Sequence, residues 1–126
     1  MVNRDAIRMS VHGQPYISQA EDVVTLIEDK MVRSLFIAGH DTVIVDATHM
    51  SEERINRWRS AAWELSFAVF PAGKGECIDR AIASDRRYLI DVIKRMADIT
   101  DFCFGAVIEK YPNQSPIMVS NIEDIL

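Results

Sequence analysis

Two short segments of the chain carry side chains that could bind or activate a hydroxyl group. The first is Asn3-Arg4-Asp5, which comes just before a predicted helix, and the second is Asp46-Ala47-Thr48-His49, which follows a short apolar run. A carboxylate at the end of a buried strand can hold a hydrated Mg²⁺ or accept a proton from an attacking hydroxyl. Asp5 and Asp46 are therefore candidates for this chemistry, and the alternative for each is a helix cap or a turn former.

A second group of candidates is basic and lies in the C-terminal half of the chain. Arg80, Arg86 and Arg87 lie on and after one predicted helix. Guanidinium groups on a helical hairpin can neutralise the charge of a transferring phosphoryl group. The alternative is a solvated charged face. The histidines are scattered along the chain, and a surface or capping role is expected for each: His12, His40 and His49.

Two helices are predicted between the acidic segments. A short helix over Asp5–His12 ends at Gly13. A longer amphipathic helix has apolar side chains every three or four residues from Val23 to Ala38. Its start and its end are predicted from a capping box and a helix-ending glycine, formed by Ser18, Glu21 and Gly39.

Short β-branched or apolar runs predict strands at Thr42–Val45 and Leu65–Phe70, with a possible last strand at Ile117–Val119. Ser51 is predicted to cap the helix between the first two strands, and two more helices are expected at 76–83 and 89–99. Helices that alternate with short apolar strands indicate an α/β fold with a mostly parallel sheet. Right-handed crossovers then place helices on both faces of that sheet.

The composition is that of one globular domain. The chain has 126 residues, 48% of them hydrophobic and 26% charged, which argues against disorder. Its net charge of -5 means that a polynucleotide partner would have to meet a local basic patch. Cys77 and Cys103 form no CxxC pair or zinc-binding cluster, so we expect two buried thiols in a reducing compartment. We find no apolar signal segment and no apolar run near the roughly 20 residues that span a membrane, and expect a cytoplasmic protein.

Three stretches, taken in their order and spacing, resemble one protein family. They are Val2-Asn3-Arg4-Asp5-Ala6-Ile7-Arg8, then Ala38-Gly39-His40-Asp41-Thr42-Val43-Ile44-Val45-Asp46-Ala47-Thr48-His49, then Glu76-Cys77-Ile78-Asp79-Arg80 with the helix that follows. The chain is in this respect similar to the polynucleotide 5′-kinases of bacteriophages and their relatives. The resemblance implies a P-loop kinase-like three-layer sandwich, truncated at its start, over residues 1–126 with a lid-like segment at about 76–99.

The resemblance also implies roles for individual residues. Asp5 matches the aspartate that takes the proton from the substrate 5′-hydroxyl, and Arg4 is its neighbouring arginine. Asp46, Thr48 and His49 match the segment that borders the nucleophile, although the family usually has asparagine where His49 stands. Arg86 matches the lid arginine that contacts the donor phosphates, and Arg80 and Arg87 are the alternatives for this position.

One motif of the family is absent from the sequence. A strand and a G-x-x-x-x-G-K-S/T loop precede the N-R-D segment in the family, and these 126 residues contain no such loop. We therefore expect no cofactor, with Mg²⁺ and ATP bound only if the loop is supplied from elsewhere. The family's first strand lies in the middle of the sheet, so we expect Ile117–Val119, another protomer or a foreign partner to fill its place. A homo-oligomer is the expected result.

Three functions agree with these observations. The first is a catalytically incomplete kinase-like protein that binds a nucleotide, an oligonucleotide end or a protein, for example as a phage-encoded inhibitor of a host factor. The second is an active 5′-hydroxyl kinase whose P-loop comes from another chain or from an upstream start. The third is a structural assembly protein without a ligand site. No membrane partner is expected.

Overall fold

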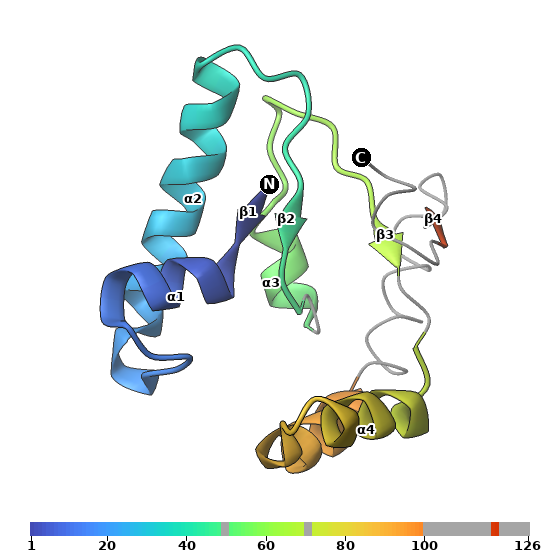
Figure 1. Cartoon of the computed structure of the whole chain (residues 1–126). Coiled ribbons are helices and arrows are strands. Elements are labelled where there is room, and N and C mark those ends of the chain that lie inside the picture. The colour runs from blue at the N-terminus through green and yellow to red at the C-terminus, as the bar shows by residue number, and fades with distance from the viewer. Residues whose placement is uncertain (49–50, 70–71, 100–116, 119–126) are drawn as a thin grey trace. The chain divides into compact units, whose positions relative to one another are not determined.

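The computed structural model describes residues 1–48, 51–69, 72–99 and 117–118 (Figure 1). The chain was predicted to form a single domain, and its contacts divide it into two compact units, Met1–Thr48 and His49–Leu126. Each unit is described by itself below.

The first unit is built on a pair of short parallel strands. Strand β1 (Val2–Asn3) pairs with β2 (Val45–Asp46), so that Val2 lies opposite Val45 and Asn3 opposite Asp46. The backbone N–H of Val2 also donates to the carbonyl of Ile44 at 2.7 Å. The strand predicted at Thr42–Val45 thus begins three residues later and ends one residue later than predicted. Strand β1 was not predicted.

Helix α1 (Arg4–His12) follows β1 directly and confirms the predicted short helix. The Asn3 side chain caps its start by accepting a hydrogen bond from the backbone N–H of Ala6 at 2.8 Å. Gly13 ends the helix with φ at +66°, a left-handed conformation that glycine adopts without a steric cost.

Helix α2 (Glu21–Ile37) confirms the predicted long helix, and a 3₁₀ turn, η1 (Ser18–Ala20), precedes it. Gly39, at φ +95°, ends the helix as predicted, because its N–H and that of His40 return to the last-turn carbonyls. The predicted capping box is wrong. The Ser18 hydroxyl lies beside the Gln19 side chain, and the Glu21 carboxylate binds two arginines instead of capping the helix.

The buried core of the first unit is small. It consists of Val2 from β1, Ile7 from α1, and Val24 and Val32 from α2. Glu28 of α2 is only 1% exposed and lies on the same buried face as Val24 and Val32. One face of α2 therefore carries a carboxylate among its core residues, which requires a partner of opposite charge.

The second unit contains a second parallel pair, β3 (Ala68–Val69) with β4 (Ile117–Met118). Before it lies α3 (Glu52–Asn56), whose N-cap is Ser51 as predicted. The spacing of Ile55, Trp58 and Ala62 predicted a longer helix, whereas α3 ends at Asn56. The chain turns after Asn56, and the indole N–H of Trp63 donates to the Trp58 carbonyl at 2.7 Å.

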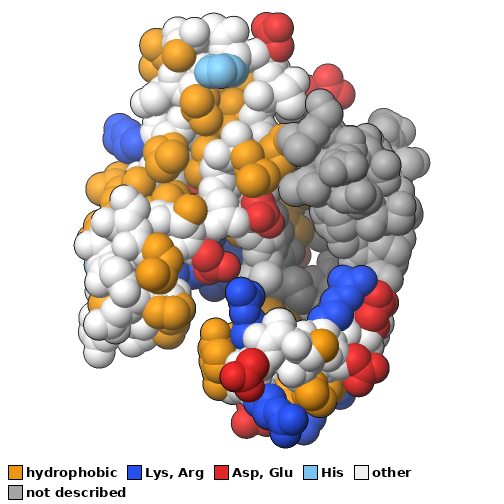
Figure 2. Space-filling view, viewed as in Figure 1, with side chains coloured by type: hydrophobic (Ala, Val, Ile, Leu, Met, Phe, Trp, Pro, Cys, Tyr) orange, Lys and Arg blue, Asp and Glu red, His pale blue; other side chains and the backbone are white. Residues whose placement is uncertain are grey.

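The two predicted helices that follow are also found. Helix α4 (Lys74–Ala83) is joined to a helix over residues 90–99 through a polar break at residues 84–86 and a 3₁₀ turn, η2 (Arg87–Leu89). At the break, Asp85 has φ at +57°, and the N–H groups of Asp85 and Arg86 return to carbonyls of α4. Acidic and basic side chains are mixed over α4 (Figure 2).

The protein is a mixed α/β protein, as predicted, and its strand pairs are parallel. In the described residues the two pairs form separate two-stranded sheets, whereas the strands predicted at Thr42–Val45 and Leu65–Phe70 were expected to share one sheet. The sequence is ambiguous between helix and strand at 102–108 and predicts a loop at 112–116, and both segments lie outside the described residues. None of the helices that the structure describes combines the length and apolar character of a membrane span.

Candidate functional site

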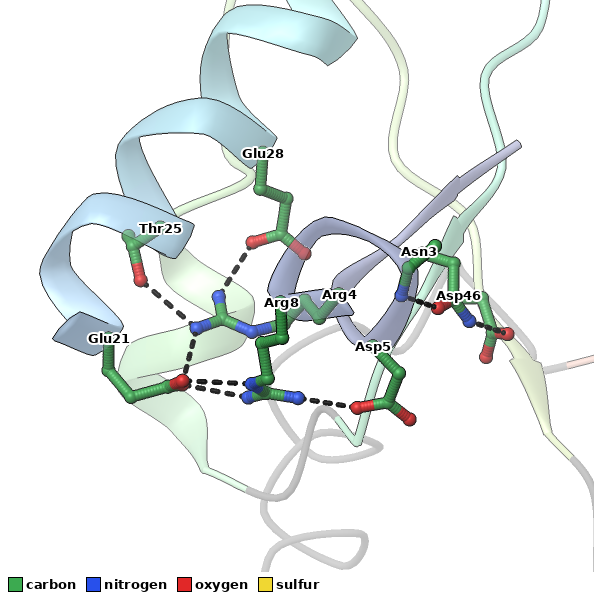
Figure 3. A network of polar contacts seen from close by, with 9 residues as sticks. Asn3, Arg4, Asp5, Arg8, Glu21, Thr25, Glu28 and Asp46 are labelled. Carbon is green, nitrogen blue, oxygen red and sulfur yellow. Dashed lines mark hydrogen bonds and ion pairs between the residues drawn. The ribbon is translucent and has the colours of Figure 1, made fainter. Parts of the chain in front are cut away.

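The candidate site lies at the carboxyl ends of β1 and β2 and is formed by Asn3, Asp5 and Asp46, here called the strand-end site (Figure 3). The Asn3 amide nitrogen donates to Asp46 Oδ2 at 2.7 Å, while its oxygen caps α1. The orientation of the amide is settled by its surroundings, because a backbone N–H needs an acceptor and a carboxylate needs a donor. The sequence segments around Asp5 and Asp46, 41 residues apart, are thus brought to one edge.

Asp5 lies on the first turn of α1, two residues after Asn3. Its side chain is 80% exposed, and Oδ1 accepts a hydrogen bond from Arg8 Nη1 at 2.6 Å. Arg8 thereby restricts the rotamer of an otherwise solvated carboxylate. The negative charge near the start of a helix is also favourable.

Each of the two carboxylates keeps one oxygen for a further donor. Asp5 uses Oδ1 for Arg8, and Asp46 uses Oδ2 for Asn3. Within the described residues, Asp5 Oδ2 and Asp46 Oδ1 accept no hydrogen bond. The strand-end site therefore presents two acceptors to solvent, an arrangement suited to a ligand hydroxyl, amine or hydrated cation.

Arg4 points away from this edge and into a charged cluster between α1 and α2 (Figure 3). Its guanidinium donates to Glu28 at 2.8 Å, to Glu21 at 3.0 Å and to the Thr25 hydroxyl at 3.2 Å. Its side chain is 13% exposed. The arginine that the resemblance implied for substrate binding is thus engaged in ion pairs that neutralise the buried Glu28.

Arg8 completes this cluster, and the five residues Arg4, Arg8, Glu21, Thr25 and Glu28 are here called the arginine network. Arg8 binds Glu21 with Nε and Nη2, at 2.8 and 2.7 Å, and stacks over the Tyr16 ring at 5.8 Å from its centre. The Arg8 hydrogen bonds, with those from Arg4, lower the pKa of Glu21 to about 2, against the opposing effect of burial. The same pairing raises the pKa of Arg8.

The other predicted site residues are placed as follows. Thr48 is exposed and lies two residues beyond β2, and His49 lies outside the described residues. Arg80, Arg86 and Arg87 are exposed and belong to the second unit. Arg80 forms an ion pair with Glu76 one turn earlier on α4. The described parts of the chain hold no cluster of three or more side chains suited to a metal ion.

Sequence reasoning placed Asn3 in a candidate segment without predicting its contacts, and it did not predict the partners of Arg8 and Glu21. Asn3 had a usable signal, since asparagine before a helical pattern is a strong N-cap. The spacing of Asp5 and Arg8 by three residues also indicated a contact on one helix face. Glu21 was assigned to a capping box, and its true partners lie 13 and 17 residues away on another helix.

Comparison of the chain with protein-family models, with curated proteins and with solved structures finds no match.

Proposed function

We propose that the protein is a polynucleotide-kinase-like binding module that holds the 5′-hydroxyl end of an oligonucleotide, or a nucleoside hydroxyl, at the strand-end site. The observation that carries this proposal is the pair of acceptor oxygens, Asp5 Oδ2 in the first turn of α1 and Asp46 Oδ1 at the end of β2. A hydroxyl donates one hydrogen bond and accepts others, so a carboxylate can bind it without any proton transfer. In parallel α/β folds, ligands commonly bind at this end of the strands.

The proposal also covers the overall fold and the roles of the other candidate residues. The two parallel pairs would belong to a three-layer P-loop kinase-like fold in a cytoplasmic protein. Following the resemblance, Thr48 and His49 would border the hydroxyl, and Arg80, Arg86 and Arg87 are proposed to bind phosphate groups. Arginines suit this role because their guanidinium groups pair with phosphate oxygens.

An acidic pair also predicts which end of a strand is accepted. A 5′-hydroxyl is neutral and can donate a hydrogen bond to either carboxylate. A 5′-phosphate carries nearly two negative charges and would be repelled at the same place. We therefore expect the protein to prefer a 5′-hydroxyl oligonucleotide over the same oligonucleotide with a 5′-phosphate by at least about tenfold, the effect of one hydrogen bond to a charged group.

Fluorescence anisotropy with two end-labelled oligonucleotides, alike except for the 5′ group, measures this preference. Asp5→Asn and Asp46→Asn should each weaken binding of the 5′-hydroxyl form. Asp41→Asn is the matched control, because it removes the same charge from an exposed residue on the other side of β2. Equal affinity for the two ends, or no binding at all, would reject the proposal.

The same site could serve a kinase, with Asp5 as the base that takes the hydroxyl proton. Phosphoryl transfer also needs a cradle for the donor phosphates, and the sequence has no G-x-x-x-x-G-K-S/T loop. We therefore expect binding without transfer. Transfer of labelled phosphate from ATP to the oligonucleotide, abolished by Asp5→Asn, would establish the kinase instead.

A further inference from the structure

Asn3 is the contact between the two halves of the strand-end site. Its amide oxygen accepts a hydrogen bond from one segment of the chain, and its amide nitrogen donates a hydrogen bond to another. Oδ1 accepts from the Ala6 N–H in the first turn of α1, and Nδ2 donates to Asp46 Oδ2 after β2. Both bonds are short, at 2.8 and 2.7 Å. One planar amide therefore fixes the start of α1 and the end of β2 to each other.

The Asn3 amide also determines which atom of Asp46 is presented to a ligand. Because Nδ2 occupies Oδ2, the other oxygen, Oδ1, is left as the acceptor. Asp46 is an exposed residue, and apart from Asn3 no described side chain forms a hydrogen bond or an ion pair with it. Without the amide, the carboxylate would be restrained only by its own rotamer preferences and by water.

We propose that Asn3 is a positioning residue, which holds Asp46 so that its second oxygen and that of Asp5 are presented together to the ligand hydroxyl. This inference rests on the proposed function for its ligand. The Asn3–Asp46 contact is present in the protein without ligand, so the positioning of Asp46 and the binding of the ligand can be tested separately.

Two substitutions separate the two bonds of Asn3. Asn3→Ser retains a good N-cap oxygen and removes the amide donor, whereas Asn3→Ala removes both. We expect Asn3→Ser to lower the unfolding midpoint less than Asn3→Ala does, because it keeps the helix cap. We also expect it to weaken 5′-hydroxyl oligonucleotide binding by up to about tenfold, because the Asp46 acceptor is no longer held in place. In the ligand-free protein, NMR scalar couplings should show that the Asp46 χ1 angle changes from one rotamer to an average of several.

A reversed pair provides a rescue that a purely structural role would not produce. In Asp46→Asn alone, the Asn3 donor engages the oxygen of the new amide, whose NH₂ group then faces the ligand and removes the acceptor. In the double variant Asn3→Asp/Asp46→Asn, the carboxylate at position 3 still caps α1 and accepts from the amide at position 46. The oxygen of that amide is then directed to the ligand, so we expect the double variant to bind more tightly than either single variant.

The outcomes distinguish the inference from the proposed function. One possible result is that the wild-type protein does not bind the oligonucleotide but Asn3→Ser allows Asp46 to sample several rotamers. The proposed function is then wrong, whereas the inference that Asn3 fixes the Asp46 side chain is supported. If Asn3→Ser leaves the Asp46 couplings unchanged, the inference is wrong. It is also wrong if the wild type binds and the double variant binds no better than Asp46→Asn alone.

Discussion

Arg8 and Glu21 form a two-pronged ion pair between α1 and α2, with Nε–Oε1 and Nη2–Oε2 distances of 2.8 and 2.7 Å. Both side chains are largely shielded, at 15% and 21% exposure. Glu21 also accepts from Arg4 at 3.0 Å, so one carboxylate holds two arginines of α1 against α2. The arginine network therefore links the two helices by charge as well as by apolar contacts.

The first prediction concerns the stability of this link. Glu21→Gln removes the charge that both arginines share, and we expect it to lower the free energy of unfolding by about 2–3 kcal/mol, somewhat less than for a fully buried pair. Urea denaturation followed by circular dichroism measures the change. Asp29→Asn is the matched control, because its pair with Arg33 is a more exposed contact within α2 and should contribute under about 1 kcal/mol. Equal losses in the two variants would contradict the prediction.

The second prediction is the pH range in which the link is lost. The pKa of Glu21 is about 2 in the folded protein, against an ordinary value of 4.5. The unfolded state then binds the extra proton first as the pH falls, so the contribution of Glu21 is complete above pH 4.5 and declines toward pH 2. The difference in unfolding free energy between the wild type and Glu21→Gln should shrink over this range. A difference that is constant with pH would show that the Glu21 charge does not stabilise the fold.

Much of the helical structure could be predicted from local signals. Gly13 and Gly39 end α1 and α2 as predicted, and Ser51 caps α3, because each signal acts within a few residues of the chain. Strand β1 could not be predicted in the same way. It has two residues, too few for any alternation of apolar and polar side chains to appear.

The candidate site was predicted in part. Asp5 and Asp46 were identified as candidate carboxylates, and their segments are brought to one edge. Arg4 was expected beside them and instead binds Glu28, 24 residues along the chain. A sequence does not specify which of its acidic residues will be buried on the neighbouring helix, so the partner of an arginine at this separation is decided by tertiary packing.

The third prediction compares two glycine substitutions. Gly13 has φ at +66°, and the space around it is open, so Gly13→Ala should cost about 1–2 kcal/mol for backbone strain alone. Gly75 lies within α4, where an added Cβ would also meet no atom within 4 Å. Gly75→Ala should therefore stabilise the protein by about 0.5–1 kcal/mol through helix propensity. Thermal unfolding of the two variants tests both signs, and shifts in the same direction would contradict the prediction.

The fourth prediction is that the protein self-associates. Both described strand pairs have only two strands, and such pairs have edges with unpaired backbone groups. Large apolar side chains are also exposed on α2, with Leu26 at 58% and Ile37 at 87%, and hydrophobic side chains are visible at the surface in Figure 2. Association would cover these groups. Ile117–Val119, one of the segments expected to fill the place of the missing strand, contributes β4, which pairs with β3 of its own chain.

Size-exclusion chromatography with light scattering measures the association directly. Leu26→Glu is the test variant and should weaken the association, because it places a charge on the exposed apolar face without entering the core. Asp22→Lys, one turn earlier on α2, is the control for a charge change on an exposed position. A strictly monomeric wild type of 14.3 kDa would contradict the prediction.

The arginine network has a consequence for the response of the first unit to temperature. Apolar contacts weaken on cooling, because the hydrophobic effect near room temperature is mainly entropic. The dehydration cost of an ion pair, in contrast, falls as the temperature rises. The few core residues of this unit and its charged cluster therefore reach their greatest strength at different temperatures. A helix pair built in this way keeps part of its attachment on warming, when bonds to a shielded carboxylate become less costly to form.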